Sequence, residues 1–210
     1  MAQDDGWTPL WDAVGSGDTE VIRALIGGGT DVNSADADGW TPLWLALGDF
    51  NPAVVEVLLK LGADVNHRDE RGGTPLMFLA RKCDERFNPE LSLGFAKCLD
   101  CLFEVGANVR AVDYTGQGAL ESATIAGCDA IVGILIDAGA DPNRSDADRW
   151  SPLMWAARHN DVSLAALLLD RGANIDLKNG LGDTALDIAE SHDLEKIVMY
   201  LHLRGASTEN

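Results

Sequence analysis

An internal repeat is the feature of this sequence that most constrains its fold. The phrase DGWTPLW at residues 5–11 recurs 33 residues later at 38–44, and a looser copy, DRWSPLM, occupies 148–154. Each repeat also ends in a variant of a second phrase, such as GTDVN at 29–33 and GADVN at 62–66. A fixed period of this length predicts stacked supersecondary units, because so short a unit cannot bury its apolar face alone.

The same frame divides the 210 residues into six repeats. They run at about 5–37, 38–70, 71–114, 115–147, 148–180 and 181–210. Because the repeats fill nearly every position, we predict a single domain over residues 1–210, with no room for a second one.

Each repeat is predicted to form two short helices. Five of the six repeats open with a Thr or Ser whose hydroxyl can accept from a free N–H of the first helical turn, and Pro follows in four of these five. A second apolar run follows, such as EVIRALI at 20–26, and then a Gly that can take positive φ at the helix end. The predicted order within a repeat is a first helix, a turn, a second helix and the Gly that ends it. An extended loop, called the tip below, then leads to the next repeat.

The third repeat is longer than the others, at 44 residues. Its extra 11 residues lie between the two expected helices, within RKCDERFNPELSLGF at 81–95. Asn88, Pro89 and Glu90 are typical of a helix start, so the second helix is predicted to begin early and to run to about Glu104. The insertion is either an arm that projects from the turn edge or a surface insertion without a role, since loops accept added length cheaply.

On these phrases the sequence resembles the ankyrin repeat family, whose 33-residue signature carries T-P-L-H-x-A. The resemblance extends over residues 5–207 and is weaker in the fourth repeat, where Gly118 and Ala119 replace Thr-Pro. Other residues replace the family's His in every repeat: Trp11, Trp44, Met77, Glu121, Met154 and Asp187. The resemblance implies an all-α repeat solenoid of six stacked helix-turn-helix units with β-hairpin-like tips. It also implies a concave groove, formed by the first helices and the tips, through which proteins of this family bind other proteins without chemistry of their own.

No catalytic or metal-binding pattern is recognisable in the sequence. The CLDC segment at 98–101 has half of a zinc-site spacing, but Cys98 and Cys101 fall at i and i+3 of an apolar run, which favours core packing. The four His residues are scattered over different repeats, and no Ser or Cys lies in a nucleophile motif. We therefore predict a protein that is not an enzyme and that uses no cofactor and no metal.

The formal net charge of -18 bears on the choice of partner. So acidic a chain is a poor ligand for nucleic acid or for anionic membranes, which call for Lys and Arg. Half of the excess lies in residues 1–66, which hold 11 acidic and two basic residues. The absence of a long apolar run and of a signal-peptide pattern predicts a cytoplasmic protein with four reduced cysteines, and we expect it to be monomeric when free.

The repeated tryptophans are the main candidates for binding. Trp7, Trp40 and Trp150 precede the Thr-Pro or Ser-Pro pair, where family members return a tip to the groove. The predicted partner-binding surface comprises these three residues with Leu45, Phe78 and Trp155 from the first helices and with Asp36, Asp38, Asp69 and Glu70 from the tips. Aromatic anchors with a charged border are typical of protein-binding surfaces. The alternative is packing of each Trp against the next tip, which we favour for Trp44, whereas we favour recognition for Trp155.

The tip carboxylates admit a second interpretation. Asp side chains satisfy local backbone donors in turns, and the ligand spacing of a calcium loop is absent here. The function expected from the whole sequence is a non-catalytic protein-binding module, either an inhibitor or immunity-type protein for a partner with a basic or mixed surface, or a structural or assembly subunit of a larger complex.

Overall fold

The computed structural model describes residues 8–82 and 89–206, without the side chains of 89–92. The chain divides into two compact units. Unit 1 comprises the described residues up to Asn108, and unit 2 comprises the described residues from Val109 onward. The prediction of one domain over residues 1–210 stays a prediction, and each unit is described here by itself.

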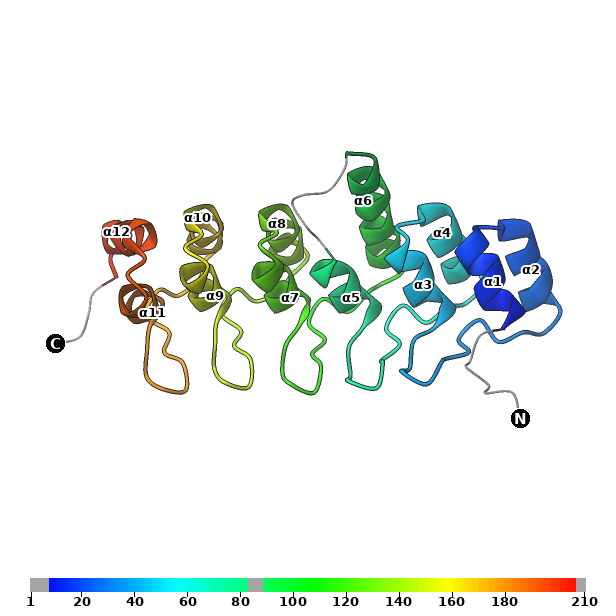
Figure 1. The fold of residues 1–210 in the computed structure, drawn as a ribbon, viewed down its shortest axis with the longest axis horizontal. Helices are drawn as coiled ribbons and strands as arrows, with labels where there is room; N and C mark the ends of the chain where they lie inside the picture. The colour runs from blue at the N-terminus through cyan, green and yellow to red at the C-terminus, as the bar shows by residue number, and fades with distance from the viewer. Residues whose placement is uncertain (1–7, 83–88, 207–210) are drawn as a thin grey trace. The chain divides into compact units, whose positions relative to one another are not determined.

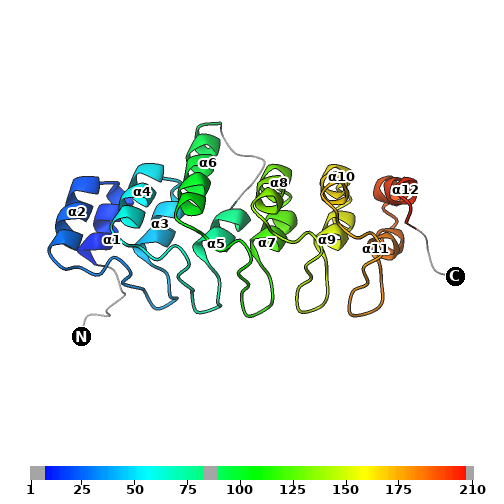
Figure 2. The ribbon, with the colours of Figure 1, turned by 180° about the vertical axis from the view of Figure 1, so that it is seen from behind.

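Each repeat contributes a pair of helices to its unit (Figures 1 and 2). In unit 1 the pairs are α1 (Pro9–Ser16) with α2 (Thr19–Gly27), α3 (Pro42–Gly48) with α4 (Pro52–Lys60), and α5 (Pro75–Arg81) with α6 (Pro89–Glu104). In unit 2 they are α7 (Ala119–Ala126) with α8 (Asp129–Asp137), α9 (Pro152–Arg158) with α10 (Val162–Asp170), and α11 (Ala185–Ser191) with α12 (Glu195–Leu203). Over residues 8–82 and 89–206 the chain forms no strand, so each unit is an all-α repeat solenoid and the predicted fold class is confirmed.

The first helices begin where the Thr-Pro phrase predicts. The hydroxyls of Thr74, Ser151 and Thr184 accept from the backbone N–H three residues on, at 3.4, 3.4 and 3.2 Å. Thr8 and Thr41 make no such bond, and their buried Oγ1 atoms have no hydrogen-bond partner. The capping prediction is therefore confirmed for three of the five residues and wrong for these two, which open the repeats that carry a bulky Trp at the position of the family's His.

Within each unit, the first helices of neighbouring repeats pack against one another, and so do the second helices. In unit 1 α3 contacts α1 and α5, while α4 contacts α2 and α6; in unit 2 α9 contacts α7 and α11, while α10 contacts α8 and α12. The Leu of each Thr-Pro-Leu phrase, or its counterpart, is buried in every repeat: Leu10, Leu43, Leu76, Leu120, Leu153 and Leu186. Burial of such a side chain contributes about 2 kcal/mol, so the repeated Leu forms a continuous apolar seam within each unit.

The closing phrase of each of the first four repeats links it to the next one. The side chain of Asn33 donates to the carbonyl of Gly62 at 3.3 Å and accepts from the N–H of Asp64 at 2.8 Å. Asn66 and Asn143 make the same pair of bonds to the repeats that follow them. In the third repeat Arg110 replaces Asn, and its Nε donates to the carbonyl of Gly139 at 3.1 Å. The Asn of GADVN therefore has a structural role in stacking.

Helix α6 carries part of the long insertion of the third repeat. It begins at Pro89 and ends at Glu104, which confirms the predicted bounds, and Figures 1 and 2 show its first turns extending beyond α4. A Cβ on Gly94 of α6 would lie 2.6 Å from the carbonyl oxygen of Phe50, so only glycine allows this approach of α6 to the turn between α3 and α4. The rings of Phe50 and Phe95 pack beside it, with centroids 5.6 Å apart.

The cysteines differ in state. Cys98 and Cys101 are free thiols on α6, and burial raises the pKa of the Cys98 thiol to about 12, which makes it an inert core residue. Cys128 is disulfide-bonded, so the prediction of four reduced cysteines is wrong. Sequence spacing gave no sign of this bond, because the four cysteines have no repeated spacing across the repeats. Across the described ranges, no helix combines the length and apolar character needed to span a membrane.

Candidate functional site

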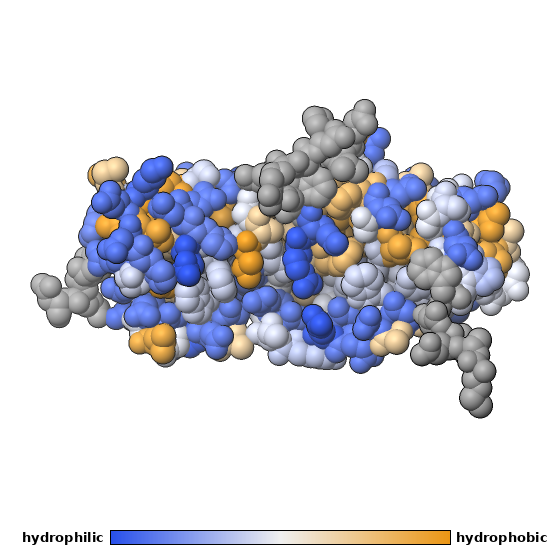
Figure 3. Space-filling view, in the orientation of Figure 1, coloured by the Kyte–Doolittle hydropathy of each residue, from blue (hydrophilic) through white to orange (hydrophobic). Residues whose placement is uncertain are grey.

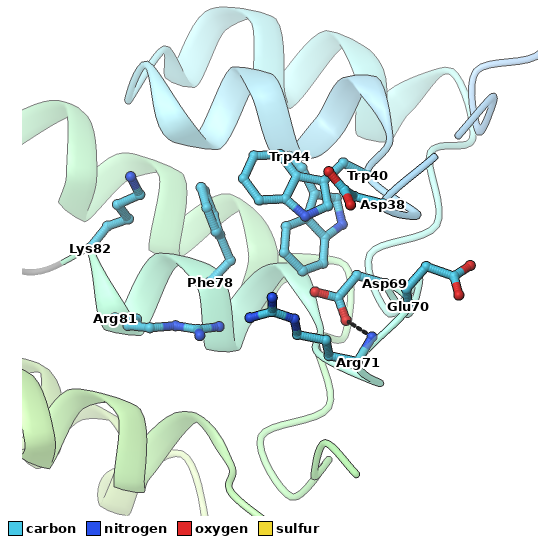
Figure 4. A pocket seen from close by; sticks show the side chains of 9 residues that line it. All are labelled: Asp38, Trp40, Trp44, Asp69, Glu70, Arg71, Phe78, Arg81 and Lys82. Carbon is cyan, nitrogen blue, oxygen red and sulfur yellow. Dashed lines mark hydrogen bonds between the residues drawn. The ribbon is translucent and has the colours of Figure 1, made fainter. Parts of the chain in front are cut away.

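A groove in unit 1 brings together residues from two consecutive tips and two first helices. Its volume is about 480 Å³, in the range of sites that receive small ligands or a few side chains. The lining is formed by aromatic Trp40, Trp44 and Phe78, acidic Asp38, Asp69 and Glu70, and basic Arg71, Arg81 and Lys82 (Figure 4). Five of these residues, Trp40, Phe78, Asp38, Asp69 and Glu70, belong to the surface predicted from the sequence.

The three aromatic rings of the groove form one cluster. Trp40 stacks on Trp44 at a centroid distance of 5.6 Å, and Phe78 and Trp40 make an edge-to-face contact at 5.2 Å between centroids. Trp44 and Phe78 are 1% and 6% exposed, whereas Trp40 is 36% exposed. Trp40 is therefore the ring that a ligand can reach, and the other two hold it in place.

The tip acids divide into two kinds. A carboxylate oxygen of Asp36 accepts from the N–H groups of Asp38 and Trp40 at 3.0 and 2.9 Å, and Asp69 closes the next tip in the same way through Arg71 and Gly73 at 2.9 and 2.7 Å. Asp113 and Asp146 repeat the arrangement in unit 2. These four carboxylates serve turn geometry, as the second interpretation of the tip acids expected.

The carboxylates of Asp38 and Glu70, unlike that of Asp69, do not accept hydrogen bonds from the backbone of their tips. Both are exposed, and the N–H of Glu70 donates to the carbonyl of Asp38 at 3.1 Å, which ties the two tips together. Their side chains therefore lie on adjacent tips at one side of the groove, free to meet a ligand.

The basic residues of the groove were missed by sequence reasoning. Arg81 and Lys82 follow Phe78 by three and four residues, which places them on the same helix face as that ring. The ammonium of Lys82 lies 5.3 Å from the centroid of the Phe78 ring, a cation–π contact. The predicted acidic border is thus only half of the border, and the helical spacing from Phe78 was the signal that could have revealed the other half.

Leu45 and Asp36 were predicted for this surface, but they are not among the residues that line the groove. Leu45 is half-buried, and its Cδ2 lies 3.9 Å from where a Cβ on Gly15 of α1 would stand. Trp7 lies outside the described residues.

In unit 2 the predicted pair Trp150 and Trp155 is in contact. The two rings lie 4.8 Å apart between centroids, and Trp155 also lies 6.2 Å from the ring of His159. Both tryptophans are partly exposed, although the Nε1 atom of Trp155 is buried without a hydrogen-bond partner. The pair forms a second aromatic surface on the first helix and tip of the fifth repeat.

A buried acid explains why the fourth repeat departs from the Thr-Pro phrase. Glu121 is 1% exposed; its carboxylate accepts from the N–H of Gly118 at 2.9 Å and pairs with Arg144 at 3.2 Å. A Cβ on residue 118 would lie 2.9 Å from this carboxylate and 3.0 Å from the carbonyl of Ala111, so glycine and glutamate replace Thr and His together. Burial raises the pKa of Glu121 against the opposing effect of Arg144.

Metal binding finds no support in the described part of the chain, where no three His, Cys, Asp or Glu side chains gather as ligands. The geometry of the unit 1 groove instead offers one reachable ring, buried rings beneath it and charges of both signs at its border, which suits the binding of another molecule's side chains.

Comparisons with known proteins agree on one family. The family model for ankyrin repeats in three copies matches residues 1–69, 51–146 and 139–209. The crystal structure of the ankyrin repeat domain of Bcl-3 is similar with a TM-score of 0.82 and 30% identity, covering 97% of this chain and 89% of that chain. An ankyrin repeat domain from Acinetobacter baumannii AYE is similar with a TM-score of 0.80 and 27% identity, covering 95% of this chain and 98% of that one.

Curated relatives match over shorter stretches. The B-cell lymphoma 3 protein homolog of Mus musculus is 32% identical over 111 residues, which is 52% of this chain and 25% of that protein. The chain spans smaller shares, 11% and 4%, of the Rattus norvegicus protein fem-1 homolog A and the Danio rerio neurogenic locus notch homolog protein 1.

Proposed function

Because this chain belongs to the ankyrin repeat family, whose repeats are protein–protein interaction modules, we propose that it binds a partner protein through the groove of unit 1. Repeats of this family are generally non-catalytic, so the proposed activity is binding alone. Trp150 and Trp155 of unit 2 are proposed as a second contact with the partner.

The observation that carries this proposal is the state of Trp40. Its ring is 36% exposed above two aromatic rings that are almost fully buried, in a groove of about 480 Å³. A large exposed ring on a rigid aromatic base is typical of the anchor residues that dominate protein interfaces. Its conformational freedom is already restricted, so binding loses little side-chain entropy.

The overall charge suggests what kind of partner associates fastest. A chain with a net charge of -18 attracts a basic or mixed protein surface and repels an acidic one. We propose a cytoplasmic, monomeric protein that occupies the surface of such a partner, as an inhibitor or an immunity-type protein does. Electrostatic attraction would then accelerate capture, while Trp40 and its neighbours would slow release.

A permanent assembly subunit is the second candidate, and apolar residues of the sixth repeat favour it. Met199 and Leu203 stand one turn apart on α12 and are 64% and 78% exposed. Figure 3 shows hydrophobic surface at the tip before α11, where Leu181 is 88% exposed. Sedimentation of the purified chain separates the two candidates: a monomer that stays folded supports the first, and self-association or aggregation that Met199→Lys and Leu203→Lys abolish supports the second.

The test of the proposed function begins with the partner itself, captured from the source cells and purified. Titration calorimetry then compares the native chain with Trp40→Ala and with Tyr114→Ala, a tip residue of unit 2 that is 76% exposed and serves as the matched control. Trp40→Ala is expected to weaken binding by about 2 kcal/mol or more, roughly 30-fold in Kd, and Tyr114→Ala by little. Equal affinity of the native chain and Trp40→Ala, with both folded, would overturn the proposal.

A further inference from the structure

The border of the unit 1 groove carries charges of both signs on separate sides. Figure 4 shows Asp38, Asp69 and Glu70 on one side of the aromatic rings and Arg81 and Lys82 on the other, while the side chain of Arg71 extends from the tip of Asp69 and Glu70 toward Arg81. The acids come from two consecutive tips, Arg71 comes from the second of these tips, and Arg81 and Lys82 come from the end of α5. The separation follows from the fold, because tips and helix ends lie at opposite ends of each first helix.

These charges are available to a ligand. Arg81, Lys82, Asp38 and Glu70 are all exposed, and among the described residues no ion pair joins the two sides of the groove. Asp69 has one oxygen engaged in closing its own tip, so Asp38 and Glu70 are the acids with the greater freedom to pair. A segment of one sign only would satisfy one side of the groove and be repelled by the other.

Between the two sides lies the reachable face of Trp40. Trp44 and Phe78 are buried beneath it, so an occupant gains most by placing an apolar side chain on Trp40 itself. The order of features across the groove is therefore acid, aromatic ring, base. The complementary order in an occupant is base, apolar side chain, acid.

We propose that the groove of unit 1 receives a single segment of a partner protein that carries a basic side chain toward Asp38 and Glu70, an apolar side chain on Trp40 and an acidic side chain toward Arg81 and Lys82. This inference rests on the proposed function and adds the chemistry of the bound segment. The net charge of this chain favours a partner whose surface as a whole is basic or mixed. The groove adds a separate requirement, that the bound segment carries charges of both signs. The two-signed border also sets the direction in which the segment lies, because reversing it would oppose like charges.

The test uses a phage-displayed library of random 12-residue peptides, selected against the full-length native chain and against two charge-reversed variants. Arg81→Glu with Lys82→Glu, the acidic variant, makes the α5 side of the groove acidic as well, and Asp38→Lys with Glu70→Lys, the basic variant, reverses the two exposed acids of the tips; Asp69 and Arg71 are unchanged in both. The native chain is expected to enrich peptides with an apolar residue flanked by a base on one side and an acid on the other. The acidic variant should enrich peptides with bases on both sides, and the basic variant peptides with acids on both sides.

Direct binding gives the size of the effect. Synthetic copies of the native chain's enriched peptides should bind either charge-reversed variant about tenfold more weakly, as expected for the loss of two exposed charge contacts and their replacement by repulsion. Circular dichroism and thermal melting establish that each variant is folded. Arg81→Gln with Lys82→Gln supplies a milder variant if the reversed one fails to fold, and an intermediate loss is expected from it.

The outcomes separate this inference from the proposed function. Peptides that lose binding to Trp40→Ala but carry one sign of charge, or that ignore the charge-reversed variants, overturn the two-signed segment and leave the groove as a binding site. Enriched peptides that bind Trp40→Ala as well as the native chain overturn the proposed function of the groove. A selection that enriches no peptide at all overturns the proposal that the occupant is a peptide segment.

Discussion

Trp40 and Trp44 come from one repeated phrase and occupy opposite environments. Trp40 is 36% exposed and Trp44 is 1% exposed, although their rings stack at 5.6 Å. Trp44→Ala is therefore expected to lower the free energy of unfolding by about 3–5 kcal/mol through the cavity that it leaves, and Trp40→Ala by much less. Urea denaturation monitored by circular dichroism measures both, and equal losses would show that the two rings serve packing alike.

Glu121 and Asp187 stand at the same position of their repeats and should respond to pH in opposite ways. Burial raises the pKa of Glu121, so the folded chain holds this proton more tightly than the unfolded chain does. The contribution of Glu121 to stability is then largest at low pH. It is lost as the pH rises from the ordinary pKa of a glutamate through the raised pKa of Glu121 in the folded chain. Hydrogen bonds from Thr184 lower the pKa of Asp187, so its contribution is lost as pH falls through the lowered value.

Two isosteric variants check these signs. Urea denaturation between about pH 3 and pH 7 gives the free energy of unfolding of the native chain, Glu121→Gln and Asp187→Asn, in a range that brackets ordinary carboxyl pKa values. The free energy of unfolding of the native chain minus that of Glu121→Gln should decrease as pH rises. The free energy of unfolding of the native chain minus that of Asp187→Asn should increase. The same pH trend in both differences would contradict the opposite environments assigned to these carboxylates.

At the scale of elements, the close approach of α6 to the turn between α3 and α4 depends on Gly94. A Cβ there would lie 2.6 Å from the backbone oxygen of Phe50, which cannot move without the turn, so Gly94→Ala is expected to cost about 1–3 kcal/mol of stability. Gly133 in α8 is the matched control, because its Cβ would make only ordinary contacts, the nearest at 3.6 Å. Gly133→Ala should stabilise the chain by about 0.5–1 kcal/mol. Thermal or urea denaturation measures both, and a neutral Gly94→Ala would contradict the packing described for α6.

The helices were predictable from the sequence because their signals are local. Pro at the first helical position and Gly after the second helix act within a few residues, and even the early start of α6 at Pro89 followed from such a signal. The missing caps at Thr8 and Thr41 were not predictable, because these residues have the same Thr-Pro phrase as Thr74, whose hydroxyl does cap its helix. The disulfide of Cys128 was not predictable either, because the four cysteines have no repeated spacing across the repeats.

The candidate site was predictable in part for the same reason. Residues of the repeated phrase, such as Trp40 and Asp38, could be placed by comparison between repeats. Arg81 has a counterpart in Arg158 of the fifth repeat, but the position of the two residues at the groove follows from how α5 packs beside the tips. Asp36 and Asp69 were placed at the right tips, but their hydrogen bonds to the backbone are a property of the folded turn.

At the scale of the whole molecule, the net charge of -18 should act on the rate of association. Asp38→Asn with Glu70→Gln removes two charges without disturbing the tips that Asp36 and Asp69 close, and is expected to slow association with a basic partner and to flatten its dependence on salt. Stopped-flow measurements between about 0.02 and 0.5 M salt span the relevant screening lengths. An association rate that is indifferent to both salt and these substitutions would exclude electrostatic attraction.

The central claim is that a partner protein contacts the exposed face of Trp40. The chain has six tryptophans, so a nitrogen-15 NMR spectrum resolves their indole N–H signals, which single Trp→Phe variants assign. On addition of the purified partner, the signal of Trp40 is expected to shift more than that of Trp11, which is 3% exposed in the core of the first repeat. A saturated complex in which the Trp40 signal stays in place would contradict the account.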